Sequence, residues 1–153
     1  MALTNSPADV LRYALIAAGG GSLPSSGNAW PIAAWQESDL PDNFITLYDT
    51  SGNIDGRFQN NGAVQEHPGI QVRVRALNPS DGNTKIRALL DIIDLQIRET
   101  LVTCNHPVGT GVSMYLIHNV SRKGTILSLG KDTPTTKRAL FTVNLTISLS
   151  QIS

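Results

Sequence analysis

The chain has 153 residues, which is enough for one domain with a substantial core and too few for two comfortable ones. Charged residues make up only 16% of it, below the usual share of about 25%, and such a low-charge surface suits contact with a partner subunit. The 12 basic and 12 acidic residues cancel. This neutrality disfavours a general nucleic-acid-binding module, because there is no broad positive field to hold a polyanion.

Cysteine usage and hydropathy point to a reducing compartment. Cys104 is the single cysteine, so neither an intrachain disulfide nor a metal cluster of the CxxC type can form. The apolar run from 10 to 18 contains Arg12, is too short to span a bilayer and has no basic region before it. We therefore expect a soluble protein of the cytoplasm.

The N-terminal segment predicts a helix from Ser6 to Ala18. Ser6 can cap the free amides, the proline after it suits the first helical position, and Gly19 can close the helix in a left-handed conformation. The segment 19–43 that follows is rich in Gly, Ser and Pro but contains Trp30 and Trp35. We expect these two rings to pin it over the core.

Residues 44–48 (FITLY) have the composition of a short strand, and the polar segment 51–68 predicts a mobile loop or a loose hairpin. After Pro68, apolar residues alternate with Gln71, Arg73 and Arg75. This period of two indicates a strand with one buried face. Both arginines are then expected on the outward, solvent-facing side.

The second half of the chain predicts one long helix and three strands. An apolar stripe extends the helix from Asp81 to Thr100, and two short strands are expected at 113–120 and 125–129. The clearest strand signal is 141–149, where apolar residues alternate with polar, uncharged ones. Because exposed edge strands usually carry charges, this uncharged face suggests a strand that pairs with or lies against another chain.

Taken together, these elements predict a single α+β domain spanning residues 1–153. The order of helix, strands, helix and strands favours a mostly antiparallel β-sheet covered on one side by two α-helices. No internal repeat interrupts this order.

The sequence gives little support for catalysis, a metal or a cofactor. The three histidines stand far apart, and the glycine-rich runs lack the lysine and hydroxyl of a phosphate-binding loop. Cys104 and His106 lie two residues apart, which leaves a small Cys/His enzyme as an alternative. An inert, partly buried thiol is the simpler interpretation, so we predict no catalytic, metal-binding or cofactor-binding residue.

Several segments resemble the minor capsid or tail terminator proteins of long-tailed bacteriophages. The resemblance covers about two thirds of the chain, in order, and its most specific part is HPGIQVRVR at 67–75. The other segments that carry it are NAWPI (28–32), LPDN (40–43), LYDT (47–50) and DGR (55–57).

The resemblance implies a structural virion protein rather than an enzyme. Such subunits form a homo-oligomeric ring, usually of six copies, that caps the tail tube, stops its elongation and docks to the head connector. DNA passes through the lumen without specific binding, no membrane is involved, and the subunit waits in the host cytoplasm before assembly. A head-tail joining or neck protein is the structural alternative.

For this ring we predict that the final strand and the long helix contact neighbouring copies, and that the segment 51–68 docks on the tube. Heterologous contacts of this kind close into a ring when the rotation between copies allows it. The residues expected at the interfaces are Arg57, Arg73, Arg75, Asn144, Thr146 and Ser148.

Overall fold

The computed structural model describes residues 3–57, 64–131 and 138–152, with the side chains of 53–57 and 64–66 left aside. Within these residues the chain forms two α-helices, one short 3-10 helix and seven strands. In chain order they are α1 (Pro7–Ala17), η1 (Pro24–Ser26), β1 (Ile32–Ala34), β2 (Phe44–Arg57), β3 (Val64–Ala76), α2 (Pro79–Leu95), β4 (Thr100–Asn105), β5 (Val112–Arg122), β6 (Leu127–Lys131) and β7 (Ala139–Gln151).

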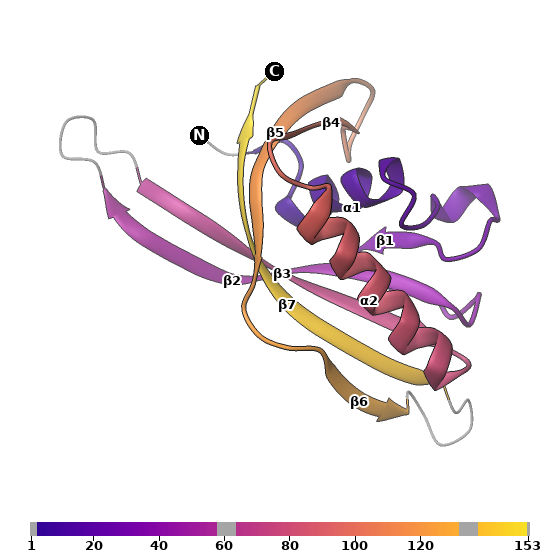
Figure 1. Ribbon diagram of the computed structural model, residues 1–153. Helices are drawn as coiled ribbons and strands as arrows, with labels where there is room; N and C mark the ends of the chain where they lie inside the picture. The colour runs from indigo at the N-terminus through magenta and orange to yellow at the C-terminus, as the bar shows by residue number, and fades with distance from the viewer. Residues whose placement is uncertain (1–2, 58–63, 132–137, 153) are drawn as a thin grey trace.

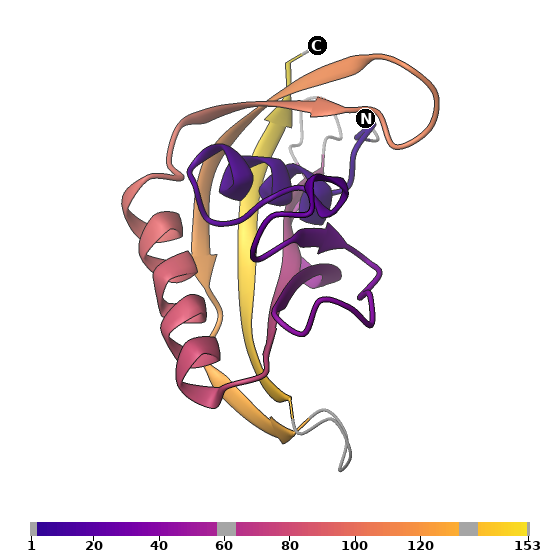
Figure 2. The same ribbon diagram turned by 90° about the vertical axis from the view of Figure 1, so that its right-hand side faces the viewer.

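The strands form one curved sheet in the order β1-β2-β3-β7-β5-β4, with β6 also paired to β7. Only β1 and β2 pair in parallel; the other pairs are antiparallel. Both helices lie on the same face of the sheet (Figures 1 and 2). The predicted α+β class, with a mostly antiparallel sheet covered on one side by two helices, is therefore confirmed.

Both helices begin as their sequences suggest. The Ser6 hydroxyl accepts a hydrogen bond from the backbone N–H of Asp9 at 3.3 Å, and Asn78 caps α2 through the N–H of Ser80 at 2.9 Å. Gly19 ends the first helix with a φ of 84°. These local contacts satisfy amides that have no partner inside a helix.

The second helix is shorter than predicted, and the strand that follows it was missed. Helix α2 ends at Leu95, the backbone turns at Glu99 with a φ of 48°, and β4 pairs with β5 from Thr100 onward. Leu101 continues the spacing of the helix's apolar stripe, yet it is 60% exposed, whereas Val102 beside it is buried. Strand pairing with β5 overrides the helical spacing here.

The segment 51–68, predicted to be a mobile loop or a loose hairpin, is a hairpin as far as it is described, so the second of these alternatives is confirmed. Pairing of β2 with β3 continues through two register shifts to Arg57 and Val64. The third strand, β7, pairs with β3 only from Gly69 onward. The far ends of β2 and β3 therefore leave the body as a two-stranded arm (Figure 1). Such a ribbon needs no apolar face, which removes the signal that identifies strands in a sequence.

Two glycines permit close backbone approach where the arm leaves the body. A Cβ at Gly52 would lie 2.0 Å from the carbonyl oxygen of His67, and a Cβ at Gly69 would lie 2.5 Å from that of Ser51. Both distances are below any normal contact, so each position requires glycine. Part of the polar, glycine-containing composition that suggested a loop is therefore needed where the two strands of the arm approach each other closely.

Strand β7 lies in the middle of the sheet. One of its edges pairs with β3, and the other pairs with β5 along its second half and with β6 along its first half. The expectation that this strand pairs with another chain is therefore wrong, because its backbone groups are already used. What remains available is its polar face.

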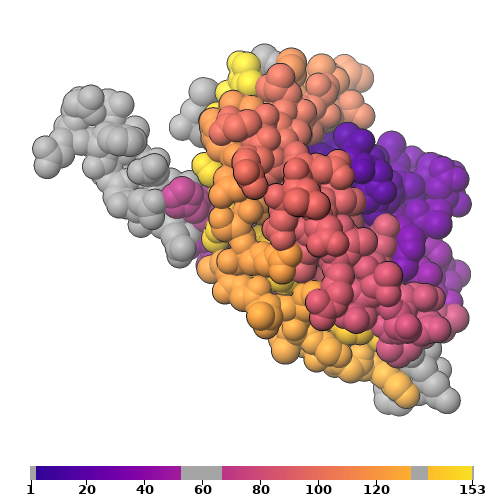
Figure 3. All heavy atoms as spheres, viewed as in Figure 1, coloured from indigo at the N-terminus to yellow at the C-terminus, as the bar shows by residue number. Residues whose placement is uncertain are grey.

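The glycine-rich segment 19–43 lies over the body, but only one of its two tryptophan rings packs against the core as expected. Trp30 packs against the core, while Trp35 is 47% exposed and donates from Nε1 to Asp49 Oδ2 at 2.7 Å. Atoms of β5 and β6 (orange) lie on one side of α2, and atoms of this N-terminal segment (purple) lie on the other (Figure 3). No helix in the described ranges is long and apolar enough to cross a membrane.

Candidate interaction surface

The helix-free face of the sheet, here called the outer face, presents a row of uncharged polar side chains. On β7, the odd-numbered residues from 139 to 147 are buried on the helix side, which sends Asn144, Thr146 and Ser148 to the outer face. Asn144 is exposed, and the other two are half-buried. The structure thus brings these three predicted residues together in one row.

Neighbouring strands widen this row into a patch. Gln71 of β3 pairs with Asn144, Asn119 of β5 pairs with Ser148, and Ser121 pairs with Thr146. The Asn119 amide also donates to the Ser121 hydroxyl at 3.2 Å. We call these six residues the polar patch: Gln71, Asn119, Ser121, Asn144, Thr146 and Ser148. Its side chains carry both donors and acceptors but no formal charge.

Arg75 also points to the outer face, but the expectation that it meets solvent is wrong. Its exposure is 2%, and its guanidinium donates to the carbonyl oxygens of Ser38, Asp39, Pro41 and Asp42 at 2.6–3.2 Å. Its Nη1 also lies 3.4 Å from Glu37 Oε2. A guanidinium offers five N–H donors, and those of Arg75 bind a segment of the same chain.

That segment, residues 37–42, is here called the strap. It folds back over the outer face, where Arg73 forms an ion pair with Glu37 at 3.3 Å and retains 27% side-chain exposure. Leu140 and Thr142, which lie beside Arg75 and Arg73 in the sheet, are buried as well. The sequence correctly placed both arginines on this face but gave no sign that the strap covers it.

Arg138, just before β7, is a second anchor for the strap. It is 4% exposed, and its Nη1 donates to the Asp39 carbonyl at 2.7 Å. Its guanidinium also forms ion pairs with the carboxylates of Asp39 at 3.3 Å and Asp42 at 3.5 Å. Hydrogen bonds from a charged donor are stronger than neutral ones, so two buried arginines hold the strap in place.

Arg57, the last of the predicted interface residues, is the final residue of β2. Its backbone pairs with Val64 in the arm, while its side chain is outside the described part of the molecule.

The Cys/His pair is not arranged for nucleophilic catalysis. Cys104 is fully buried in β4, and burial, followed by the nearby charge of Asp9, raises the pKa of its thiol to about 12. The Nε2 atom of His106 lies 2.8 Å from the hydroxyl of Ser113. A thiol with that pKa stays protonated at neutral pH, and the thiolate is the nucleophilic form.

Metal ligands are also scattered. Across residues 3–57, 64–131 and 138–152, no group of three His, Cys, Asp or Glu side chains is placed to hold an ion.

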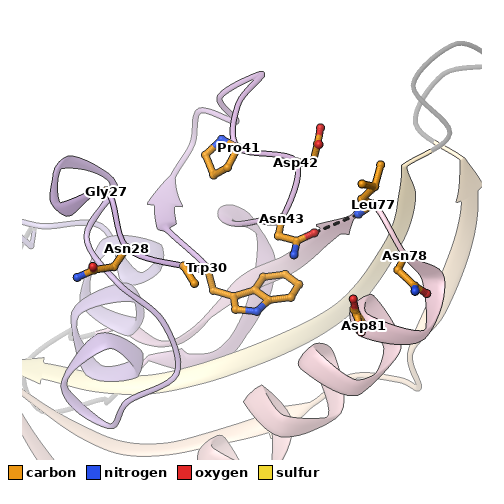
Figure 4. Close-up of a pocket in the computed structure, with 10 residues that line it drawn as sticks. Gly27, Asn28, Trp30, Pro41, Asp42, Asn43, Leu77, Asn78 and Asp81 are labelled. Atoms are coloured by element: carbon orange, nitrogen blue, oxygen red, sulfur yellow. Dashed lines mark hydrogen bonds between the residues drawn. The ribbon is translucent and has the colours of Figure 1, made fainter.

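A cleft beside the N-terminus of α2 was not anticipated from the sequence. It has a volume of about 440 Å³, and its walls come from the loop before β1, the end of the strap and the start of α2 (Figure 4). Trp30 extends its ring toward Asp81 of α2, and Asn43 accepts a hydrogen bond from the Leu77 N–H at 3.1 Å. The only sequence signal was the isolated Trp30 in a polar segment.

Two carboxylates line this cleft. Asp42 comes from the strap and Asp81 from the first turn of α2, and Leu77 adds a side chain that is 57% exposed. We call the set Trp30, Asp42, Leu77 and Asp81 the acidic cleft. Lys85 stands beside it, with its Nζ 5.5 Å from the centre of the Trp30 ring, and burial lowers the pKa of this lysine.

No protein-family model matches the chain, and no curated protein matches it.

Proposed function

We propose that this chain is a structural subunit of a long-tailed phage, a tail terminator whose ring caps the tail tube, stops its elongation and presents the surface that docks to the head. The observation that carries the proposal is the outer face of the sheet. Helices leave this face uncovered, and its open part includes the uncharged polar patch. Such a face desolvates at less cost than a charged one, which suits contact with another protein.

The arm adds a second reason to expect a partner. Isolated two-stranded ribbons are marginally stable in water, and β3 has no third strand beside it before Gly69 within the described residues. In the proposed ring the arm reaches beyond the body of the subunit and is ordered against the tube or an adjacent copy. Docking at the tube end then couples assembly to the correct position.

The proposed partners follow from this role. Copies of the chain associate heterologously into a ring, expected to have six members by the resemblance, with the tube protein on one side and the head connector on the other. Formal neutrality fits a lumen through which DNA passes without being held. The proposed site of action is the virion, after assembly in the host cytoplasm.

The test is tail length in virions. We expect phage lacking the gene product to make tails of irregular, excessive length by electron microscopy, and the wild-type chain to restore the normal length. Thr146→Arg should fail to restore it, because an unpaired guanidinium buried in a contact costs several kcal/mol. The matched control is Thr110→Arg, in the exposed turn after β4.

Normal tails in virions without the protein would end the proposal. Normal tails with Thr146→Arg would remove the polar patch from the assembly surface and leave the function itself in place.

A further inference from the structure

Trp35 combines an unusual backbone conformation with a half-exposed ring. Its φ is 66°, in the left-handed region that bulky residues rarely adopt, and it is 47% exposed. Trp30 has a φ of 55°, but its ring packs against the core. Burial therefore accounts for Trp30 and leaves Trp35 unexplained. Strained residues of this kind cluster at binding sites, and tryptophan is enriched among the residues that dominate protein interfaces.

The ring of Trp35 is held in a fixed position beside a carboxylate. Its Nε1 donates to Asp49 Oδ2 at 2.7 Å, and its backbone N–H donates to the carbonyl oxygen of Leu47 at 2.9 Å. The other oxygen of Asp49, Oδ1, accepts from the N–H of Ala8 in the first turn of α1 at 3.0 Å. Ring and carboxylate are thus positioned before any partner arrives, which lowers the entropy lost on binding.

A pocket of about 620 Å³ opens beside these two side chains, within the range of about 300–1,000 Å³ that is typical of ligand sites. Its other walls come from the N-terminal segment, the root of the arm and the turn between β4 and β5, each of which contributes a proline. Proline rings give these walls rigid, apolar surfaces. We call these five residues the Trp35 pocket: Pro7, Trp35, Asp49, Pro68 and Pro107.

Asp49 gives this pocket a negative charge that the described side chains do not balance. It is exposed, it is the only ionisable residue among the described residues of the lining, and no described lysine or arginine forms an ion pair with it. No described cation stacks on Trp35 either. Arg12, which lines a neighbouring pocket with Trp35, is paired with Asp9. The N-terminus of α1 offsets only part of the charge, because a helix terminus carries about half an elementary charge.

We propose that the Trp35 pocket binds an arginine side chain presented by an extended segment of a partner protein. The guanidinium stacks on the exposed part of the indole and donates to Asp49, whose carboxylate has about four acceptor positions and uses two of them within the chain. Arginine suits the pocket better than lysine, because a planar guanidinium can stack and donate at once. Since the prolines make much of the wall apolar, a side chain with flanking residues fits better than a free guanidinium compound. The inference goes beyond the proposed function and does not depend on a ring.

The test is an NMR titration of the nitrogen-15-labelled chain, whose two tryptophans give two indole N–H signals. The variant Trp35→Phe identifies the Trp35 signal by its loss. This signal should move on addition of N-acetyl-arginine amide, with a dissociation constant in the millimolar range, while the Trp30 signal stays in place. N-acetyl-citrulline amide has a similar shape without the charge and should bind about fivefold more weakly. Added salt should weaken binding of the arginine probe.

Substitutions and a longer probe separate the parts of the site. Asp49→Asn keeps the size of the side chain and removes its charge, so it should weaken binding of the arginine probe about fivefold. Asp91→Asn, on the exposed side of α2, is the matched control and should bind as the wild type does. A capped leucine-arginine-leucine peptide should bind more tightly than the single capped residue, because its leucines can contact the prolines. The probe comparisons use the wild-type chain, so they hold even if Asp49→Asn releases Trp35 from its position.

Each contrary outcome overturns the proposal. A Trp35 signal that stays in place up to the highest soluble concentration of the arginine probe removes the site. Equal binding of the arginine and citrulline probes, or binding that Asp49→Asn leaves unchanged, removes the charge pairing that selects the ligand. Equal affinity for the single residue and the peptide removes the partner segment and leaves a site for a free guanidinium compound.

Failure of this inference can be told apart from failure of the proposed function. The titration reports on binding at Trp35 in the isolated chain, whereas the proposed function is tested by tail length. If tails depend on the chain but the probes do not bind, the terminator role stands and the arginine site falls.

Discussion

The two ends of the outer face belong to the same strands but differ in what covers them. Around Arg75 the strap lies over the sheet, and even Leu140 is only 6% exposed. Around Asn144, four residues further along β7, the face is open and polar. The alternation of side chains is identical at both ends. Alternation therefore determines which face a residue joins, and a distant segment determines whether that face meets water.

The largest expected effect on stability is at the covered end. Arg75→Ala removes a buried guanidinium that donates to four carbonyl groups of the strap, and it leaves Glu37 without one partner, so the free energy of unfolding should fall by about 3–5 kcal/mol. Urea denaturation of the isolated chain measures this loss.

Arg73→Ala is the matched comparison, since Arg73 lies two residues away on the same face and remains 27% exposed. Its ion pair with Glu37 should contribute about 1 kcal/mol or less, and that contribution should shrink with added salt. Equal losses for the two variants would contradict the distinction between a covered and an open end.

A pair of alanine substitutions along β7 should sharpen the contrast between the two ends. Leu140→Ala removes a buried side chain beside Arg75 and should cost about 2–3 kcal/mol. Thr146→Ala, on the open end, should change the free energy of unfolding by about 0.5 kcal/mol or less. If Leu140→Ala is as mild as Thr146→Ala, the strap does not seal its end of the sheet.

The smallest effect at neutral pH is expected on the helix side of the sheet, at Cys104. Because burial raises the pKa of this thiol to about 12, the native protein should react only slowly with thiol reagents near pH 7, and unfolded chains should react rapidly. The folded pKa lies above the unfolded value of about 8.5. The contribution of the protonated Cys104 thiol to the free energy of unfolding is therefore fully present below a pH of about 8.5 and is lost as the pH rises toward 12.

Rapid labelling of native Cys104 at neutral pH would contradict the prediction that its thiol stays protonated, and it would favour the alternative of a small Cys/His enzyme. Cys104→Ala separates the effect of ionisation from that of packing, since the pH dependence attributed to the thiol should disappear in this variant.

Sequence patterns succeeded where structure depends on near neighbours. The cap at Ser6, the glycine end at Gly19 and the alternation in β3 and β7 were all readable, because each depends on residues a few positions apart. The same patterns failed at β4, and for the arm they left a loop and a loose hairpin as alternatives. There, pairing with a strand elsewhere in the chain decided the conformation against a helical stripe or a loop-like composition.

By itself the sequence determined the fold class and the face on which each strand residue lies, since periodicity records whether a side chain meets the core. Only the tertiary structure decided the central position of β7 and the burial of Arg75 under the strap. These features join residues about 35 to 100 positions apart. No local pattern encodes such contacts, because the free energy that fixes them is gained only after the sheet has formed.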